Sequence, residues 1–513
     1  MHNSLRQPTD HSIQSRLSIS ISQLKSILFR VDWRGVFAFT LPFTLYMSTL
    51  APTIYNLDSA ELTTAAATGG LMRATGYPLY LTLSKLWLLL PVGDVGYRMN
   101  LFSAMCGALT IFLADQILRR WRVSVWASMG ALGLLASGTF FWGMSLIAEV
   151  YTLHTALMAG LIYCLLRWGD NPTPRRLLLV GLIGGMGLSH HAATFLLIPG
   201  SLFYVLVLAP KQALSPRSLF AAGIGVLIGL SFYLYLPLSY LGQPAFNYAG
   251  IYDADLVFHP INLLSPGGLF WLISGKSFAG QMLAYHGSAL WHELVNYIVQ
   301  LSQAFFIFGL LPGILGALTL LRRDWKAGLM LGLMFTFSAA FYIDYRVIDK
   351  NTMFLPSYLV WSIWIGLGYQ KLLDWLRQGD LPLRQSRGFY LIRGAPILIV
   401  LFAVLWNWSL VNLSNDYSAR QRGEAILSRI EQGALVLGWW DTVPVIQYLQ
   451  LVEGQRPDVQ AINRFLISQE DLYQYIRKEV TNRSIYIDSP PTELIESFDI
   501  ESIGPIYKIQ PPH

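Results

Sequence analysis

The sequence predicts a polytopic α-helical membrane protein with a small α/β domain at its C-terminal end. Of its 513 residues, 54% are hydrophobic and only 13% are charged, whereas a soluble domain carries roughly 25% charged residues. Apolar runs near the length that spans a bilayer, about 20 residues, recur along most of the chain. The net charge of +6 is assigned to cytoplasmic loops, which favour Lys and Arg, and not to a nucleic-acid partner.

The apolar runs predict about eleven transmembrane helices. Basic clusters such as Arg119–Arg120 and Arg322–Arg323 fall in loops on one side of the predicted membrane, and the positive-inside rule makes that side cytoplasmic. The spans are expected near residues 35–50, 97–118, 123–147, 148–167, 219–241, 297–321, 327–343, 356–373 and 395–413, with two short ones within 177–209.

Three regions follow from this topology. Residues 1–34 are polar and lack the compact apolar region of a signal peptide, so they are predicted to be a cytoplasmic tail. Residues 35–414 form the transmembrane domain, with a first outer loop at 52–96 and a long outer loop at 242–296. In residues 415–513 short β-branched runs alternate with helical patterns, which predicts a small extracytoplasmic α/β domain. The expected location is the plasma (inner) membrane, crossed many times, with a cytoplasmic N-terminus.

A pair of carboxylates follows the first predicted span, in the sequence "DSAE". Asp58 and Glu61 are three residues apart, so both side chains lie on one face if this segment is a helix. One interpretation is a capping-box-like helix start. The other is chemical: Asp58 would act as a general base that takes the proton of an acceptor hydroxyl. Charges at the edge of the hydrocarbon region are costly, which favours a use for them.

The sequence "GYPLY" predicts the start of a second short helix near Tyr77. Gly76 permits a tight turn, and the proline that follows Tyr77 suits the first turn of a helix. The free amides of a helix N-terminus can bind a phosphate, and Arg73 lies just upstream. Arg98, in "GYRMN", could add a positive charge on the same side of the membrane. The alternative for each cation is a side chain that reaches from the surface into water.

Polar residues also mark the outer ends of two later helix pairs. Glu149 and His154 lie in "AEVYTLH", and His190 and His191 lie in "GLSHHAAT". An ionisable residue inside the membrane is a functional hypothesis by default, and we expect these side chains to bind substrate or to pack as polar groups. Two neighbouring histidines do not share a helix face, and the two cysteines of the chain lie in apolar runs. No metal site is therefore predicted.

The predicted outer loop "YIDYRVIDKNTMFLPS" is dense in charge. Arg346 could hold a phosphate or pyrophosphate by paired hydrogen bonds, and Asp349 is a second candidate for substrate binding. A solvated loop without a ligand is the alternative.

In their order along the chain, these segments resemble a family of membrane proteins grouped with the protein O-mannosyltransferases of the glycosyltransferase-C superfamily. The chain departs from the family pattern at two places: Arg73, Ala74 and Thr75 stand where members commonly have His-Pro-Pro, and Arg346 and Asn351 stand where members tend to be acidic. The resemblance covers residues 35–375 and rests on "APTIYNLDSAEL", "TGYPLYLTLSKL", "GYRMNLFSAMCGAL", "AEVYTLH", "GLSHHAATFLLIPG", "YLYLPL" and "FLPSYLV".

The resemblance implies a glycosyltransferase-C fold and an enzyme that takes a hexose, such as mannose, from a polyprenyl-phosphate donor. It implies that Asp58 is the catalytic base, because an acidic residue of the first outer loop typically has that role in the superfamily, and that Glu61 is the second acid of the motif. The sugar would pass with inversion to an extracytoplasmic hydroxyl. The expected partners are the donor, a protein, glycan or lipid acceptor, and the bilayer, without nucleic acid. No cofactor is predicted, and a divalent cation is left open because some members of the superfamily use one.

Two other classes of function stay open at this stage. A lipid or solute transporter or flippase would carry its charges along a path at mid-membrane, with broken helices and internal repeats. In this chain the charges gather at the outer edge and no repeat is evident. A non-catalytic scaffold of the cell envelope would use the C-terminal domain as an interaction module. Normal complementation by an Asp58→Asn, Glu61→Gln double variant would favour the scaffold.

Overall fold

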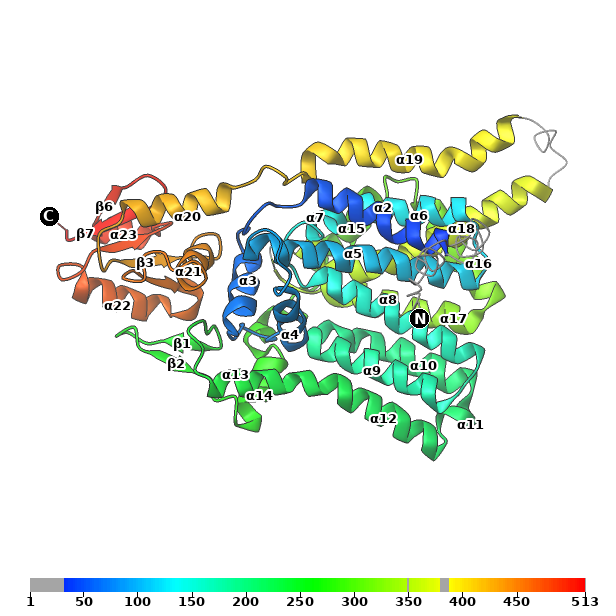
Figure 1. Cartoon of the computed structure of the whole chain (residues 1–513), viewed down its shortest axis with the longest axis horizontal. Helices are drawn as coiled ribbons and strands as arrows, with labels where there is room; N and C mark the ends of the chain where they lie inside the picture. Colours follow the sequence, from blue (N-terminus) through cyan, green and yellow to red (C-terminus); the bar gives the residue numbers. More distant parts are fainter. Residues whose placement is uncertain (1–31, 348–349, 379–386, 513) are drawn as a thin grey trace, which may run out of the picture.

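The computed structural model has a bundle of helices and, at one end of it, a smaller α/β unit (Figure 1). It describes residues 32–347, 350–378 and 387–512, so most of the predicted N-terminal tail lies outside the described residues. The bundle runs from α2 (Trp33–Thr49) to α19 (Arg387–Val411). Two short helices, α3 (Asp58–Thr68) and α4 (Pro78–Trp87), lie between the long helices and the α/β unit.

Four helical segments of the described chain are long and apolar enough to cross a membrane: Val95–Arg120, Pro216–Leu241, Trp325–Ile343 and Gly394–Val411. Only 17% of the apolar window is buried in the second and the fourth of them, so their apolar side chains face outward, as expected for helices covered by lipid. The remaining helices of the bundle's core are α6 (Val125–Ser137), α7 (Thr139–Met144), α8 (Tyr151–Asp170), α9 (Pro174–His190), α10 (Ile198–Leu208), α11 (Pro210–Ala213), α16 (Leu310–Arg323) and α18 (Leu355–Gln378).

The prediction of one continuous span over residues 297–321 is wrong. Helix α15 (Ser288–Ala304) ends before α16 begins, and Phe306 and Ile307 between them have left-handed backbone, with φ of 51° and 61°. The buried ring of Phe305 packs edge-on against Tyr358, with 6.0 Å between centroids. Hydropathy does not reveal this break, because the chain is equally apolar on both sides of it.

Helices α9 and α12 (Pro216–Leu230) approach closely because their glycines face each other. A Cβ added to Gly181 or Gly185 of α9 would overlap the backbone of α12, and one added to Gly225 or Gly229 of α12 would overlap the backbone of α9. Small residues permit such contact between helices in lipid, where no hydrophobic force drives association. Helix α9 also contacts α4, so this packing holds the outer end of α9 beside the first outer loop.

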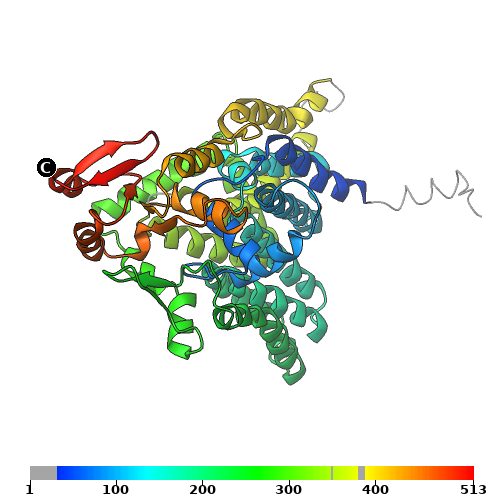
Figure 2. The ribbon, with the colours of Figure 1, turned by 60° about the vertical axis from the view of Figure 1, so that its left-hand side comes forward.

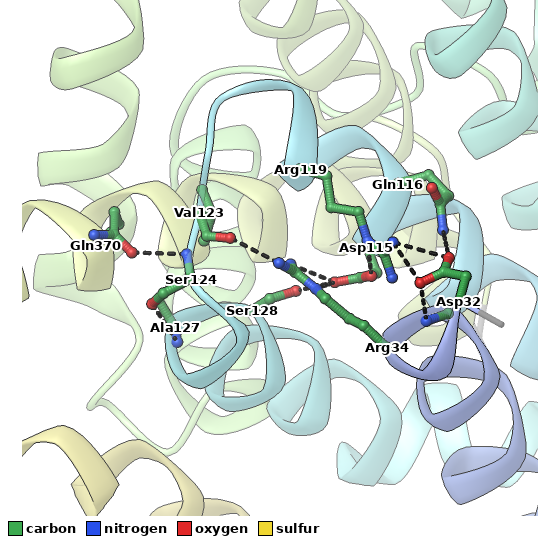
Figure 3. A network of polar contacts seen from close by, with 11 residues as sticks. Asp32, Arg34, Asp115, Gln116, Arg119, Val123, Ser124, Ala127, Ser128 and Gln370 are labelled. Atoms are coloured by element: carbon green, nitrogen blue, oxygen red, sulfur yellow. Dashed lines mark hydrogen bonds and ion pairs between the residues drawn. The ribbon is translucent and has the colours of Figure 1, made fainter. Parts of the chain in front are cut away.

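A network of charges joins α2, α5 (Val95–Arg120) and α6 at the end of the bundle away from the α/β unit (Figures 1 and 3). The Asp115 carboxylate, only 3% exposed, accepts hydrogen bonds from Arg34 at 2.6 Å, from Arg119 at 2.7 Å and from the Ser128 hydroxyl at 2.6 Å. Asp32 binds the other side of Arg119 at 2.7 Å. Two arginines balance two aspartates, so this network stabilises helix ends and leaves no unpaired carboxylate for chemistry.

The long outer loop packs against the first one. The amide of Leu71 donates to the Phe246 carbonyl at 3.0 Å, and the Tyr248 amide donates to the Leu71 carbonyl at 2.8 Å. Further along, Met282 forms an antiparallel bridge with Tyr345. The loop thereby connects the segment that carries Arg73 to the segment that carries Arg346. It follows η3 (Ser231–Leu234) and α13 (Tyr235–Leu241), and its first elements are β1 (Gly250–Tyr252), β2 (Phe258–Pro260), α14 (Pro266–Ile273) and η4 (Lys276–Gln281).

The α/β unit is built on a five-stranded mixed sheet in the order β4-β3-β5-β7-β6. Strands β3, β4 and β5 are parallel, and β6 and β7, red in Figure 2, are antiparallel to their neighbours. The carboxyl end of β3 leads directly to Trp439 and Trp440, beside the first outer loop. The elements are α20 (Ser418–Arg429), β3 (Leu435–Gly438), α21 (Val443–Leu451), β4 (Gln460–Asn463), α22 (Gln469–Glu479), β5 (Ile485–Ile487), α23 (Thr492–Ser497), β6 (Asp499–Ser502) and β7 (Tyr507–Gln510).

Candidate active site

Helix α3 begins at Asp58, but neither carboxylate of "DSAE" caps it. The N-cap position is Leu57, with φ of 57°, and no side chain binds the free amides of the first turn. The capping-box interpretation is therefore wrong. The two carboxylates do lie on one face of the helix, as their spacing predicts, because both bind Arg73. The second short helix begins as predicted, with Tyr77 at the N-cap and proline at the first helical position.

Arg73 is the centre of this group. Its Nη2 lies 2.7 Å and 2.6 Å from the two carboxylate oxygens of Asp58, and its Nη1 lies 3.3 Å from Oε2 of Glu61. The Asp58 side chain is 35% exposed, whereas the Glu61 side chain is completely buried. Of the two acids, Asp58 is thus the one that a substrate can reach.

A residue of the α/β unit completes the group. The indole Nε1 of Trp440 donates a hydrogen bond to Oε2 of Glu61 at 2.8 Å. The Arg73 guanidinium carbon lies 4.7 Å from the centroid of the Trp440 ring, within the range of a cation–π contact. The backbone joins the two parts as well, because the Leu57 amide donates to the Trp440 carbonyl at 3.1 Å.

The charges of this group influence one another. Burial raises the pKa of the Glu61 carboxyl above its usual range, although the positive charge of Arg73 lowers it. Burial opposes the charge of Arg73, but Asp58 and Glu61 outweigh that effect and raise the pKa of the guanidinium. Burial also raises the pKa of Tyr77, with Arg73 opposing it and Asp58, Glu61 and Glu149 adding to it. The Tyr77 hydroxyl therefore stays protonated and can donate a hydrogen bond close to the carboxylates.

The predicted histidines gather beside Tyr77. Its ring centroid lies 5.7 Å from that of His191 and 6.5 Å from that of His190. His154 lies 5.1 Å from His191 and 6.2 Å from His190. Nε2 of His190 is bound to the Val150 carbonyl at 2.9 Å, while both ring nitrogens of His154 lack a hydrogen-bond partner within the described part of the chain. The three histidines thus form a polar wall, in which His154 and His190 are buried.

Glu149 lies at the start of the same wall, directly before α8. It is 8% exposed, and its backbone amide donates a hydrogen bond to the Ser103 hydroxyl oxygen at 3.1 Å. Its charge acts on Tyr77, so the predicted residues Glu149, His154, His190 and His191 share one site with Asp58. Among the described residues, no group of three or more His, Cys, Asp or Glu side chains is arranged to hold a metal ion.

Two other predicted cations lie elsewhere in the structure. Arg98 donates to the backbone carbonyls of Leu88 and Leu90 and so binds the end of α4. Arg346 donates to the Ala284 carbonyl and lies over the Tyr285 ring at 5.2 Å. Neither has a carboxylate partner among the ion pairs of the described residues. Asp349, the last predicted residue, lies outside the described residues.

An apolar cleft of about 650 Å³ opens beside the Arg346 segment. It is formed between η2 (Ala192–Leu197), α15 and α17 (Trp325–Ile343). Asp344 supplies a polar group at its edge, and the Asp344 carboxylate accepts the Tyr285 amide at 2.8 Å. The cleft is lined by Leu196, Leu283, Gly287, Leu290, Trp291, Leu294, Phe337, Ala340, Phe341, Ile343 and Asp344. It has the size and lining of a site for a long hydrocarbon chain.

Part of the chain matches a known family. Residues 58–214 match the protein O-mannosyl-transferase TMEM260 N-terminal domain. The chain is protein O-mannosyltransferase-like. The matched segment begins at Asp58 and contains Arg73, Tyr77 and the histidine wall, whereas Trp440 lies outside it.

Longer similarities extend over most of the chain. It is 25% identical over 445 residues to protein O-mannosyl-transferase TMEM260 of Mus musculus, covering 83% of this chain and 62% of the relative. It is 23% identical over 491 residues to protein O-mannosyl-transferase tmem260 of Dictyostelium discoideum, covering 84% of this chain and 58% of the relative. The chain therefore spans about three fifths of the length of these relatives.

Solved structures identify the fold as glycosyltransferase-C. ArnT from Cupriavidus metallidurans, bound to undecaprenyl phosphate, has a TM-score of 0.61 at 11% identity, covering 92% of this chain and 97% of that one. The apo form of ArnT scores 0.60 at 12% identity, covering 96% and 98%. The Archaeoglobus fulgidus oligosaccharyltransferase scores 0.53 at 12% identity, covering 90% and 70%. With the apolar helices, these likenesses support a membrane location for this protein O-mannosyltransferase-like chain.

Trp440 is the site residue that the sequence did not single out. The available signal was "GWWD", directly after a buried β-branched run, since residues at the carboxyl ends of parallel strands often face ligands. Nothing in that pattern indicates which distant loop the aromatic residues would meet.

Proposed function

We propose that the chain is a membrane glycosyltransferase that moves a sugar from a polyprenyl-phosphate donor to an acceptor hydroxyl, with inversion and with Asp58 as general base. The observation that carries this proposal is the partly exposed Asp58 carboxylate, bound by Arg73 in the first outer segment of a glycosyltransferase-C fold. The names of the two relatives support a transferase, and the ArnT structure with undecaprenyl phosphate supports a donor linked to polyprenyl phosphate.

The reaction is a single displacement. The acceptor oxygen attacks the anomeric carbon of the sugar while its proton passes to Asp58. The bond between that carbon and the phosphate oxygen breaks on the opposite face, and polyprenyl phosphate leaves with the electron pair. One displacement inverts the anomeric centre, and the proton on Asp58 is later lost to water.

Arg73 orients the base. One of its nitrogens binds both oxygens of Asp58, which fixes the plane of the carboxylate and leaves its outer lone pairs for the acceptor. Glu61 holds the other side of the guanidinium. With one positive and two negative charges, this group repels a further anion, so we assign the donor phosphate to Arg346 instead. Cationic charge there would stabilise the phosphate as it leaves.

The histidine wall and Tyr77 are assigned to the sugar. Tyr77, Glu149, His154, His190 and His191 can exchange hydrogen bonds with sugar hydroxyls, and the unpartnered nitrogens of His154 are available for them. The polyprenyl chain would occupy the apolar cleft beside Arg346.

The proposal includes the orientation of the chain in the membrane and the class of acceptor. The bundle would cross the plasma (inner) membrane about eleven times, with a cytoplasmic N-terminus and the α/β unit on the extracytoplasmic side. The positive-inside bias of the loops supports this orientation. The acceptor is an extracytoplasmic protein, glycan or lipid that presents a hydroxyl group.

Sugar transfer by the full chain in lipid nanodiscs tests this function. Radiolabelled polyprenyl-phosphate mannose and other sugars are supplied with an envelope extract, and the label is fractionated into protein, glycan and lipid. We expect Asp58→Asn to lower transfer by at least about 10²-fold at equal protein level. Asp170→Asn, an exposed aspartate paired with Arg120, serves as the charge-matched control.

Full transfer by Asp58→Asn would disprove the assignment of the base. If the wild type moves the labelled lipid from one leaflet of a vesicle to the other without any sugar transfer, the protein is a flippase and the proposed enzymatic function is wrong.

A further inference from the structure

Trp440 connects the α/β unit to the acidic group through three contacts of different kinds. Its N–H donates to Glu61, its ring lies against Arg73, and its carbonyl accepts the Leu57 amide. The ring also packs edge-on against Phe465, with centroids 4.6 Å apart. Each of these partners fixes a different part of the tryptophan.

The turn that carries Trp440 is itself held firmly. It follows β3, which has a parallel neighbour on each side. The Trp439 amide donates to the buried Asp488 carboxylate at 2.6 Å, and the Val443 amide donates to the Trp439 carbonyl at 3.0 Å. Groups supported by strands and tight turns keep their geometry better than groups on free loops.

The α/β unit does not depend on Trp440 for its attachment. Ile54 and Ala60, from the first outer segment, belong to the same buried cluster as Val445 and Leu449 of α21. Figure 2 shows α21 (orange) beside α3 (blue), and the two helices are in contact. A change at Trp440 should therefore leave the unit docked.

Glu61 has few other partners. Its Oε1 has no hydrogen-bond partner among the described residues. Its Oε2 binds Trp440 at 2.8 Å and Arg73 at the longer distance of 3.3 Å. The hydrogen bond from the indole is thus the shorter of two contacts to a completely buried carboxylate. Its loss would leave the carboxylate less well paired, and an unpaired polar group is costly in a buried place.

We propose that Trp440 is a positioning residue of the transfer reaction: by binding Glu61 and covering Arg73, it keeps the guanidinium where it orients Asp58. The inference rests on the proposed function and gives the α/β unit a part in the active site. Trp440 acts through Glu61 and Arg73 and takes no proton from the substrate.

Two variants separate the contacts. Trp440→Phe keeps an aromatic face for Arg73 but removes the N–H donor, whereas Trp440→Leu removes both. We expect kcat to fall about tenfold in Trp440→Phe, the worth of one hydrogen bond to a charged group, and further in Trp440→Leu, with the KM for the donor changed less than about twofold. Trp439→Phe is the matched control, because that ring contacts Arg464 and not the acidic group.

The pH profile distinguishes positioning from loss of structure. Glu61 faces Asp58 and Arg73, and the Tyr77 and Tyr248 hydroxyls lie within reach of its charge. Because the indole N–H lowers the pKa of Glu61, its loss should move the acidic limb of the profile to higher pH. A fall in kcat without this movement, or equal profiles for Trp440→Phe and Trp439→Phe, would overturn the proposal.

A spectroscopic measurement needs no transfer activity. In ¹⁹F spectra of the 5-fluorotryptophan-labelled full chain, one resonance should titrate as Glu61 ionises, and it should stop titrating in Glu61→Gln. That resonance should be missing from Trp440→Phe. If no resonance responds to Glu61→Gln, the contact is wrong even when the enzyme is active. If one does respond but wild type transfers no sugar, the contact stands and the proposed function fails.

Discussion

One nitrogen of Arg73, Nη2, lies within 2.7 Å of both carboxylate oxygens of Asp58, although 15 residues separate the two in the chain. The same guanidinium reaches Glu61 through its other nitrogen. Arg73 stands where members of the resembled family commonly have histidine, so in this chain a permanent positive charge lies next to the proposed base.

A lysine at position 73 should not replace this arginine. An ammonium group is a compact point charge and cannot bind Asp58 and Glu61 in one planar arrangement. We expect Arg73→Lys to lower kcat by about 10²-fold while the protein remains folded. Transfer rates in nanodiscs check this, with Arg477→Lys on the exposed face of α22 as the control. Wild-type kcat in Arg73→Lys would show that charge alone suffices.

Stability should depend on pH through Glu61. Burial raises the pKa of its carboxyl in the folded chain, so the folded state holds the proton more tightly than the unfolded state does. The resulting stabilisation is fully present below the ordinary Glu pKa of about 4.3. It is lost as the pH rises through the higher pKa that Glu61 has in the folded chain.

The melting temperature of wild type relative to Glu61→Gln should therefore fall between acidic and mildly alkaline pH. Thermal unfolding in detergent at a series of pH values measures this difference. Glu496→Gln changes an exposed carboxylate of α23 and should show no such trend. If the melting temperature of wild type relative to Glu61→Gln rises with pH instead, the charge of Arg73 has a larger effect on the pKa of Glu61 than burial has.

The charge network around Asp115 should matter for stability and not for chemistry. Asp115→Asn leaves Arg34 and Arg119 without their buried carboxylate. We expect the free energy of unfolding to fall by about 2–4 kcal/mol, with kcat unchanged at temperatures where the variant is folded. Asp170→Asn, at an exposed pair, should cost less than about 1 kcal/mol. A loss of kcat in folded Asp115→Asn would give this network a role in the reaction.

Filling the apolar cleft should weaken donor binding selectively. Leu290 lines the cleft, and tryptophan at this position would occupy space assigned to the polyprenyl chain. We expect Leu290→Trp to raise the KM for a long-chain donor about tenfold and to affect a donor with a two-isoprene chain much less. Leu311→Trp, on the exposed face of α16, controls for the added indole. If Leu290→Trp changes the KM for both donors equally, the polyprenyl chain binds outside this cleft.

The sequence by itself determined the membrane class, the two short helices of the first outer loop and the pair of carboxylates on one helix face. These features depend on composition and on local spacing: a proline sets the start of α4, and a three-residue interval aligns Asp58 with Glu61. Local patterns also carried the family resemblance, because its motifs are contiguous segments.

Only the tertiary structure decided which partners these residues meet. The capping box was reasonable from spacing, yet the helix start has no side-chain cap, and Asp58 binds Arg73. At the break in the span before α16, Phe305 packs against Tyr358, a residue far along the chain. The contact of Trp440 with Glu61 joins residues 379 positions apart. Hydropathy and periodicity report a residue's neighbours along one element, whereas the contact of Trp440 with Glu61 forms when α21 of the α/β unit packs against α3. No local pattern encodes that surface.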